Sequence, residues 1–179
     1  FVYVVVVQEA GTVANPRVEF HFISRDDNAL TSGNRVYYAS APYPFRNKDG
    51  QNQTTQILKD GEALELITDP GNLEDKHFYG WYVVEPYIIS GTTNEYGIGT
   101  ADSKLYYSWP ANPDAIAFEK PISIQESNVS IGDTVHWSLN GVSGEGTVDK
   151  DGSLHVFLAP VYDKYNFINF MLYARDAGV

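Results

Sequence analysis

Residues 17–23 have the sequence RVEFHFI, in which charged or polar side chains alternate with apolar ones up to Ile23. Strict alternation is typical of a β-strand that buries one face and exposes the other to water. We therefore predict a strand here, with Val18, Phe20 and Phe22 pointing into a core. Aromatic and branched side chains favour pleated sheet over helix, so this stretch sets the expectation of a mainly β protein.

Further β-type stretches lie on both sides of this strand, with turn residues between them. Strands are predicted at residues 1–8, 36–39, 54–58, 63–67, 78–89, 105–109, 122–124, 134–139, 146–148 and 154–162. The aromatic stretch 78–89 should be a central strand that leaves the sheet or reaches an edge at Pro86, because proline cannot donate to a sheet ladder. Asn140-Gly141 and residues 149–152 are strong turn signals. From residue 121 onward these signals predict a small meander of antiparallel strands.

Helix signals are sparse. The one predicted helical turn begins at Asp114, a residue type that caps helix N-termini, and runs through Phe118. Little helix is therefore expected.

Composition narrows the class of partner. The 179 residues include 12 basic and 23 acidic side chains, for a net charge of −11, which repels nucleic-acid backbones and anionic lipid surfaces. No apolar stretch approaches the roughly 20 residues that span a bilayer. The chain has no cysteine, so disulfides and thiolate-ligated zinc are excluded. We expect neither nucleic acid nor membrane as a partner.

Three short motifs resemble a known repeat family. They are QILKDGEAL at residues 56–64, Asp69-Pro70, and KHFYGWY at residues 76–82. Together they resemble the internalin-type B-repeat, also called the Listeria/Bacteroides repeat, and residues 154–162 resemble its closing strand. The resemblance implies a β-grasp-like antiparallel or mixed sheet, found as tandem modules in Gram-positive surface proteins. Gly80 would let the backbone approach its neighbour closely, while Phe78 and Trp81 cover different parts of the core.

The spacing departs from that family in two long insertions, at residues 24–54 and between Tyr82 and the closing strand. We divide the chain into a B-repeat-like module with insertions at residues 1–118 and a meander at residues 119–179. The meander segment would complete the module and add the first strand of a following repeat. An acidic-Ala-Gly sequence occurs at both residues 9–11 and 176–178, which indicates tandem repeats of the same chain.

Catalytic and metal motifs are not evident in the sequence. The histidines lie apart from one another and form no recognisable metal-binding pair: His21, His77, His136 and His155. Neighbouring carboxylates lie at predicted turns or strand ends, where solvation explains them. An Asp149-x-Asp151-Gly152 calcium-loop start lacks its closing acid, so a hairpin turn is favoured. We predict no enzyme activity, no metal and no cofactor.

Aromatic side chains in the inserted segments are the candidate binding residues, because tyrosine and tryptophan supply large contact area at low ordering cost. They are Tyr37, Tyr38, Tyr43, Phe45, Tyr87, Tyr96, Tyr106, Tyr107 and Trp109. The prediction is an extracellular, cell-wall-associated adhesin module that binds a host protein such as an immunoglobulin or matrix component. A spacer repeat without a ligand and a carbohydrate-binding module accessory to an enzyme are the alternatives.

Overall fold

The computed structural model describes residues 12–24, 30–32, 35–39, 41–42, 45–67, 78–90, 104–107 and 112–162. Within these ranges the chain forms strands in several sheets and no helix. The predicted mainly β fold class is therefore confirmed. The predicted strand at residues 1–8 lies outside the described residues.

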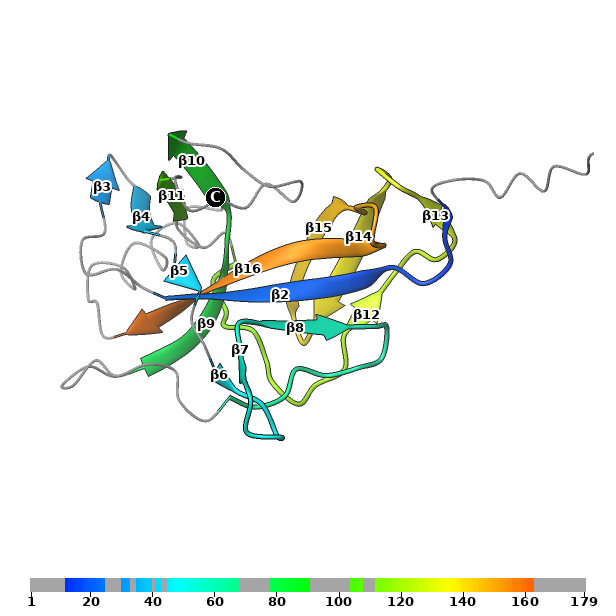
Figure 1. Ribbon diagram of the computed structural model, residues 1–179, viewed down its shortest axis with the longest axis horizontal. Helices are drawn as coiled ribbons and strands as arrows, with labels where there is room; N and C mark the ends of the chain where they lie inside the picture. Colours follow the sequence, from blue (N-terminus) through cyan, green and yellow to red (C-terminus); the bar gives the residue numbers. More distant parts are fainter. Residues whose placement is uncertain are drawn as a thin grey trace, which may run out of the picture.

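A mixed five-stranded sheet, here called the main sheet, forms the centre of the molecule (Figure 1). Its strands are β5 (Ala41–Pro42), β2 (Arg17–Ser24), β16 (Ser153–Tyr162) and β9 (Phe78–Val84), with β8 (Thr55–Leu58) also paired to β2. β16 runs parallel to β2 and antiparallel to β9. We expected β16 to close an antiparallel meander, but it leaves the preceding hairpin and pairs with the main sheet instead.

The core lies between one face of the main sheet and a three-stranded sheet. The smaller sheet consists of β12 (Ser123–Ile124), β14 (Thr134–Leu139) and β15 (Val142–Thr147). The rings of Phe20 and Trp137 meet edge to face across this interface, with centroids 5.7 Å apart. One cluster of buried apolar side chains extends from β2 through β16, so residues on both sides of Phe118 share it.

The alternation of residues 17–23 buries one face of β2, as predicted. Val18, Phe20 and Phe22 are all buried, so the prediction that they point into the core is confirmed. Glu19 and His21 consequently lie on the opposite face of the main sheet.

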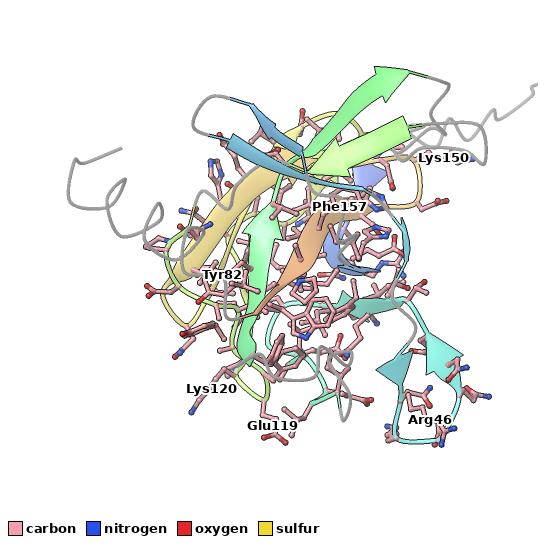
Figure 2. All side chains as sticks on the ribbon, turned by 90° about the vertical axis from the view of Figure 1, so that its left-hand side faces the viewer. Arg46, Tyr82, Glu119, Lys120, Lys150 and Phe157 are labelled. Atoms are coloured by element: carbon pink, nitrogen blue, oxygen red, sulfur yellow. The ribbon has the colours of Figure 1, made fainter. Side chains whose placement is uncertain are left out.

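Three smaller sheets extend from this body. Four strands form what we call the tyrosine sheet: β10 (Pro86–Ser90), β11 (Lys104–Tyr107), β4 (Arg35–Ala39) and β3 (Leu30–Ser32). It lies near the end of the molecule where β2 and β16 finish (Figure 1). β1 (Thr12–Val13) pairs with β13 (Val129–Ser130). β6 (Phe45–Arg46) and β7 (Asn52–Gln53) form a hairpin that carries Arg46 away from the body (Figure 2).

Proline and glycine act where the sequence indicated. β9 ends at Val84, and from Pro86 the chain enters the tyrosine sheet as β10, which confirms that it leaves its first sheet at the proline. Among the described strands, β9 pairs only with β16 and lies at the edge of the main sheet, so it is not the central strand we expected. Asn140 and Gly141 have φ angles of 46° and 93°, as a two-residue hairpin turn between β14 and β15 requires.

Two local predictions were wrong. Residues 63–67 form no strand apart from a single bridge between Ala63 and Pro121. Residues 114–118, all of which the structure describes, form no helical turn. In both segments the backbone hydrogen bonds to distant residues: Ile116 N–H donates to the Trp81 carbonyl, and the Leu64 carbonyl accepts from Glu119 N–H. These tertiary bonds outweigh the local preference.

Candidate functional site

The tyrosine sheet brings together predicted binding residues from both insertions. Tyr106 stands opposite Tyr87 on one side and Ala39 on the other. Tyr107 stands opposite Tyr38, and Tyr37 stands opposite Leu30 on the outer strand β3. Pairing between strands distant in sequence therefore places Tyr37, Tyr38, Tyr87, Tyr106 and Tyr107 in one small sheet.

The other predicted residues are not part of this sheet as described. Phe45 begins β6, in the hairpin with β7. Tyr43, Tyr96 and Trp109 lie outside the described residues. The tyrosine sheet therefore contains only some of the predicted binding residues.

A second group of polar side chains, which we call the histidine cluster, gathers on the face of the main sheet opposite the core. It consists of Glu19, His21, Asp149 and His155. The parallel register sets His155 opposite Glu19, and Phe157 opposite His21. Because alternate residues of a strand share a face, Glu19 and His21 of β2 point to the same side of the sheet as His155 and Phe157 of β16. The ring of Phe157, labelled in Figure 2, stacks on that of His21 at 4.8 Å between centroids.

The cluster forms a connected chain of polar atoms. His21 Nε2 lies 2.7 Å from His155 Nδ1. Glu19 Oε2 lies 3.2 Å from the same His155 nitrogen and 3.8 Å from His21 Nε2. The other nitrogen of His155, Nε2, lies 2.5 Å from Asp149 Oδ2. The four side chains are only 9–21% exposed, so these contacts are largely shielded from water.

Asp149 is held in place by the turn that precedes β16. Its Oδ1 accepts hydrogen bonds from the backbone N–H groups of Asp151 and Ser153, at 2.8 and 3.1 Å. The segment is a turn, as predicted, but it joins two different sheets and closes no hairpin. This use of Oδ1 leaves Oδ2 directed at His155.

Electrostatics in the cluster follow from this burial and bonding. Burial, and secondarily the neighbouring His155, lowers the pKa of His21 to about 4, so its ring is neutral at pH 7. Burial raises the pKa of Glu19, against the opposing attraction of His155. Burial would also raise the pKa of Asp149, but the hydrogen bond with His155 and those from Ser153 and Asp151 outweigh it and lower the pKa. Asp149 is therefore the firmly ionised member.

A cleft of about 520 Å³ adjoins the cluster. His155 and Asp149 line it together with two further carboxylate residues, Glu85 and Glu145. Its lining also includes the aromatic residues Trp137 and Phe157. The cleft therefore combines an acidic rim with apolar walls beside the histidine cluster.

A separate pairing occurs around His136 on β14. Its Nδ1 lies 2.5 Å from Glu126 Oε1, and its Nε2 lies 3.0 Å from Glu145 Oε2. The hydrogen bond with Glu126 raises the pKa of His136, and the charges of Glu126 and Glu145 act in the same direction. Because this imidazole is half exposed, the pairing is a surface ion pair.

The histidine cluster was not predicted from the sequence, in which 134 residues separate His21 from His155. The signal that could have found them is the shared alternation of the two strands, in which a histidine occupies the non-core face of each. Only the parallel pairing of β2 with β16 makes that signal meaningful.

Comparisons with protein-family models, with curated proteins and with solved structures find no match to the chain. Among the described residues, no helix has the length and apolar character that crossing a membrane requires.

Proposed function

We propose that the chain is a non-catalytic binding module of a bacterial cell-surface protein and recognises a host protein through the tyrosine sheet. The observation that carries the proposal is the register of that sheet. Tyr106 stands opposite Tyr87 and Tyr107 stands opposite Tyr38, although β4 belongs to one insertion and β10 and β11 belong to the other. A tyrosine-rich sheet built from insertions on a separate core is what a binding surface added to a scaffold requires.

The chemistry of tyrosine favours a protein ligand. Each tyrosine offers a large, rigid apolar surface with one hydroxyl for hydrogen bonding, and such residues dominate the energetics of protein interfaces. The resemblance to the B-repeat supports an extracellular position on the cell wall beside neighbouring repeats of the same chain. An immunoglobulin or an extracellular-matrix component is the proposed partner.

The test compares capture by the native chain with capture by two variants. Tyr87→Thr combined with Tyr106→Thr removes two rings from the tyrosine sheet, and threonine retains strand preference. Tyr79→Thr is the matched control, because Tyr79 lies on β9 in the main sheet and is 42% exposed. Each immobilised chain is incubated with serum, and binding to purified immunoglobulin G and fibronectin is then measured by interferometry.

We expect the native chain and the Tyr79 control to retain a serum protein, and the double variant to lose it while keeping the same melting temperature. Failure of the native chain to retain any serum protein overturns the proposal. In that case, binding to a glycan array would indicate a carbohydrate-binding module, and no binding at all would indicate a spacer repeat.

A further inference from the structure

The histidine cluster is separate from the tyrosine sheet, and its hydrogen bonds indicate which ring nitrogens carry hydrogens. An ionised carboxylate can only accept hydrogen bonds, so His155 Nε2, 2.5 Å from Asp149 Oδ2, carries a hydrogen. In the neutral form of the ring, which is the form that binds metals, the lone pair is then on Nδ1. We assign this tautomer from the hydrogen-bond network, and it directs the Nδ1 lone pair at His21 and Glu19.

That lone pair meets a second acceptor. Glu19 Oε2 lies 3.2 Å from His155 Nδ1, and two acceptors at this separation repel one another. A hydrogen on His21 Nε2 can bridge to His155 Nδ1, with 2.7 Å between the two nitrogens, but His21 Nε2 lies 3.8 Å from Glu19 Oε2. The three atoms therefore converge around a position that favours positive charge.

We propose that the histidine cluster binds a divalent metal ion of the zinc class through His21 Nε2, His155 Nδ1 and Glu19 Oε2. These three atoms all lie within 4.8 Å of one another. Donor atoms that bind zinc tetrahedrally at about 2.0–2.2 Å lie about 3.3 Å apart. The observed separations of 2.7, 3.2 and 3.8 Å bracket that value, so small side-chain rotations would suffice.

The identity and setting of the donors favour zinc over magnesium or calcium. Two imidazole nitrogens and one carboxylate suit zinc, whereas magnesium and calcium prefer oxygen ligands throughout. Asp149 supplies the support that metal-binding histidines usually have, because it accepts a hydrogen bond from the ring nitrogen of His155 that faces away from the ion. Stacking against Phe157 fixes the plane of the His21 ring.

An acidic cleft lies beside the histidine cluster. His155 and Asp149 line the cleft of about 520 Å³, and Glu85 and Glu145 add negative charge to it. Carboxylates on the walls of a cleft raise the local concentration of cations. The ion would join β2 to β16, two strands at opposite ends of the sequence, so its binding should stabilise the main sheet.

The test is zinc titration of the metal-free chain by calorimetry, with magnesium as the comparison ion. We expect one zinc per chain, no heat from magnesium at millimolar concentration, and a melting temperature that rises with zinc concentration. Glu19→Gln keeps the shape of the side chain but removes a charged ligand, and His21→Asn removes an imidazole. Each should weaken zinc binding at least about tenfold.

His136→Gln is the matched control, because His136 also lies between two carboxylates but on the surface. This variant should bind zinc like the native chain. Should it abolish binding while Glu19→Gln leaves binding intact, the zinc site is at His136 and the proposal is wrong. Absence of stoichiometric zinc binding by the native chain also overturns the proposal. Histidine NMR signals of the native chain give a check that needs no variant: zinc should shift those of His21 and His155 together.

Asp149 is proposed as a positioning residue for His155. Asp149→Asn should weaken zinc binding about 10- to 100-fold. Nitrogen-15 chemical shifts report which ring nitrogen carries the hydrogen, and in this variant those of His155 should move towards a mixture of tautomers. Unchanged His155 shifts would show that Asp149 does not set the tautomer.

Discussion

Gly80 on β9 passes so close to Ala115 that a Cβ atom at Gly80 would lie 2.7 Å from the Ala115 Cβ. The φ angle of Gly80 is also 134°, a backbone conformation that residues with a side chain rarely adopt. This contact joins β9 to the segment that carries Ile116, whose backbone N–H donates to the Trp81 carbonyl at 2.8 Å. The close approach predicted for Gly80 is thus confirmed, with Ala115 as the neighbour.

Gly80→Ala should therefore destabilise the fold by about 2–4 kcal/mol, through overpacking and backbone strain together. Ala115→Gly removes the opposing methyl group, so Gly80→Ala should cost less in that background. Gly61→Ala is the control for backbone strain alone, because Gly61 has a φ of 86° and open space around its Cβ position. Urea unfolding measures the free energy of unfolding of each of these variants. An equal cost of Gly80→Ala with and without Ala115 would contradict the contact.

Trp81 packs at the centre of the cluster that the aromatic motif predicted. It is 1% exposed, and its ring meets Phe22 and Phe78 edge to face, with centroids 5.1 and 6.2 Å away. Trp81→Ala should cost about 3–5 kcal/mol through the cavity it leaves. Ile57→Ala, at a residue that is 47% exposed, should cost less than about 0.5 kcal/mol. Similar urea midpoints for the two variants would show that Trp81 is not a core residue.

Asp60 anchors the turn at residues 59–62 to β12. Its Oδ1 accepts a hydrogen bond of 2.8 Å from the Ile124 backbone N–H, in a partly buried position. Asp60→Ala should cost about 1–3 kcal/mol because it leaves that N–H unsatisfied, whereas Asp60→Asn keeps an oxygen acceptor and should cost less. Hydrogen exchange at the Ile124 amide should accelerate in the alanine variant. Unchanged exchange would mean that the turn is held by its other bonds alone.

The alternation of residues 17–23 was sufficient to predict a strand and its buried face, because a period of two is a local property. Turn chemistry predicted Asn140-Gly141 and the change of sheet at Pro86 for the same reason. These predictions depend on one strand at a time. They succeed without any knowledge of which strands pair.

Strand partners could not be predicted in the same way. Nothing local to residues 153–162 distinguishes parallel pairing with β2 from antiparallel pairing with the hairpin before it. The meeting of His21 with His155 was therefore not predicted. The tyrosines of β4, β10 and β11 fell on or beside strands whose pairing with one another was not predicted either. The β-grasp connection and the B-repeat resemblance remain predictions.

His136 gives a prediction on pH, because its pairing with Glu126 and Glu145 depends on a protonated ring. The hydrogen bond with Glu126, aided by both carboxylate charges, raises the pKa of His136 in the folded chain above its unfolded value of about 6.5. A raised folded pKa means that the pairing stabilises the fold fully below the unfolded pKa. That contribution is lost as the pH rises through the folded pKa.

Glu126→Gln tests this with little other change, because glutamine retains an oxygen to accept the 2.7 Å hydrogen bond from the His136 backbone N–H. The variant should be less stable than the native chain at pH 5.5, and the difference should shrink by pH 9. Proton NMR with a metal chelator present should show the pKa of His136 falling in the variant. Glu145→Gln should lower it less, since the Glu126 hydrogen bond is the largest cause of the shift. A stability difference that is constant with pH would show that protonation of His136 is not what links β14 to Glu126.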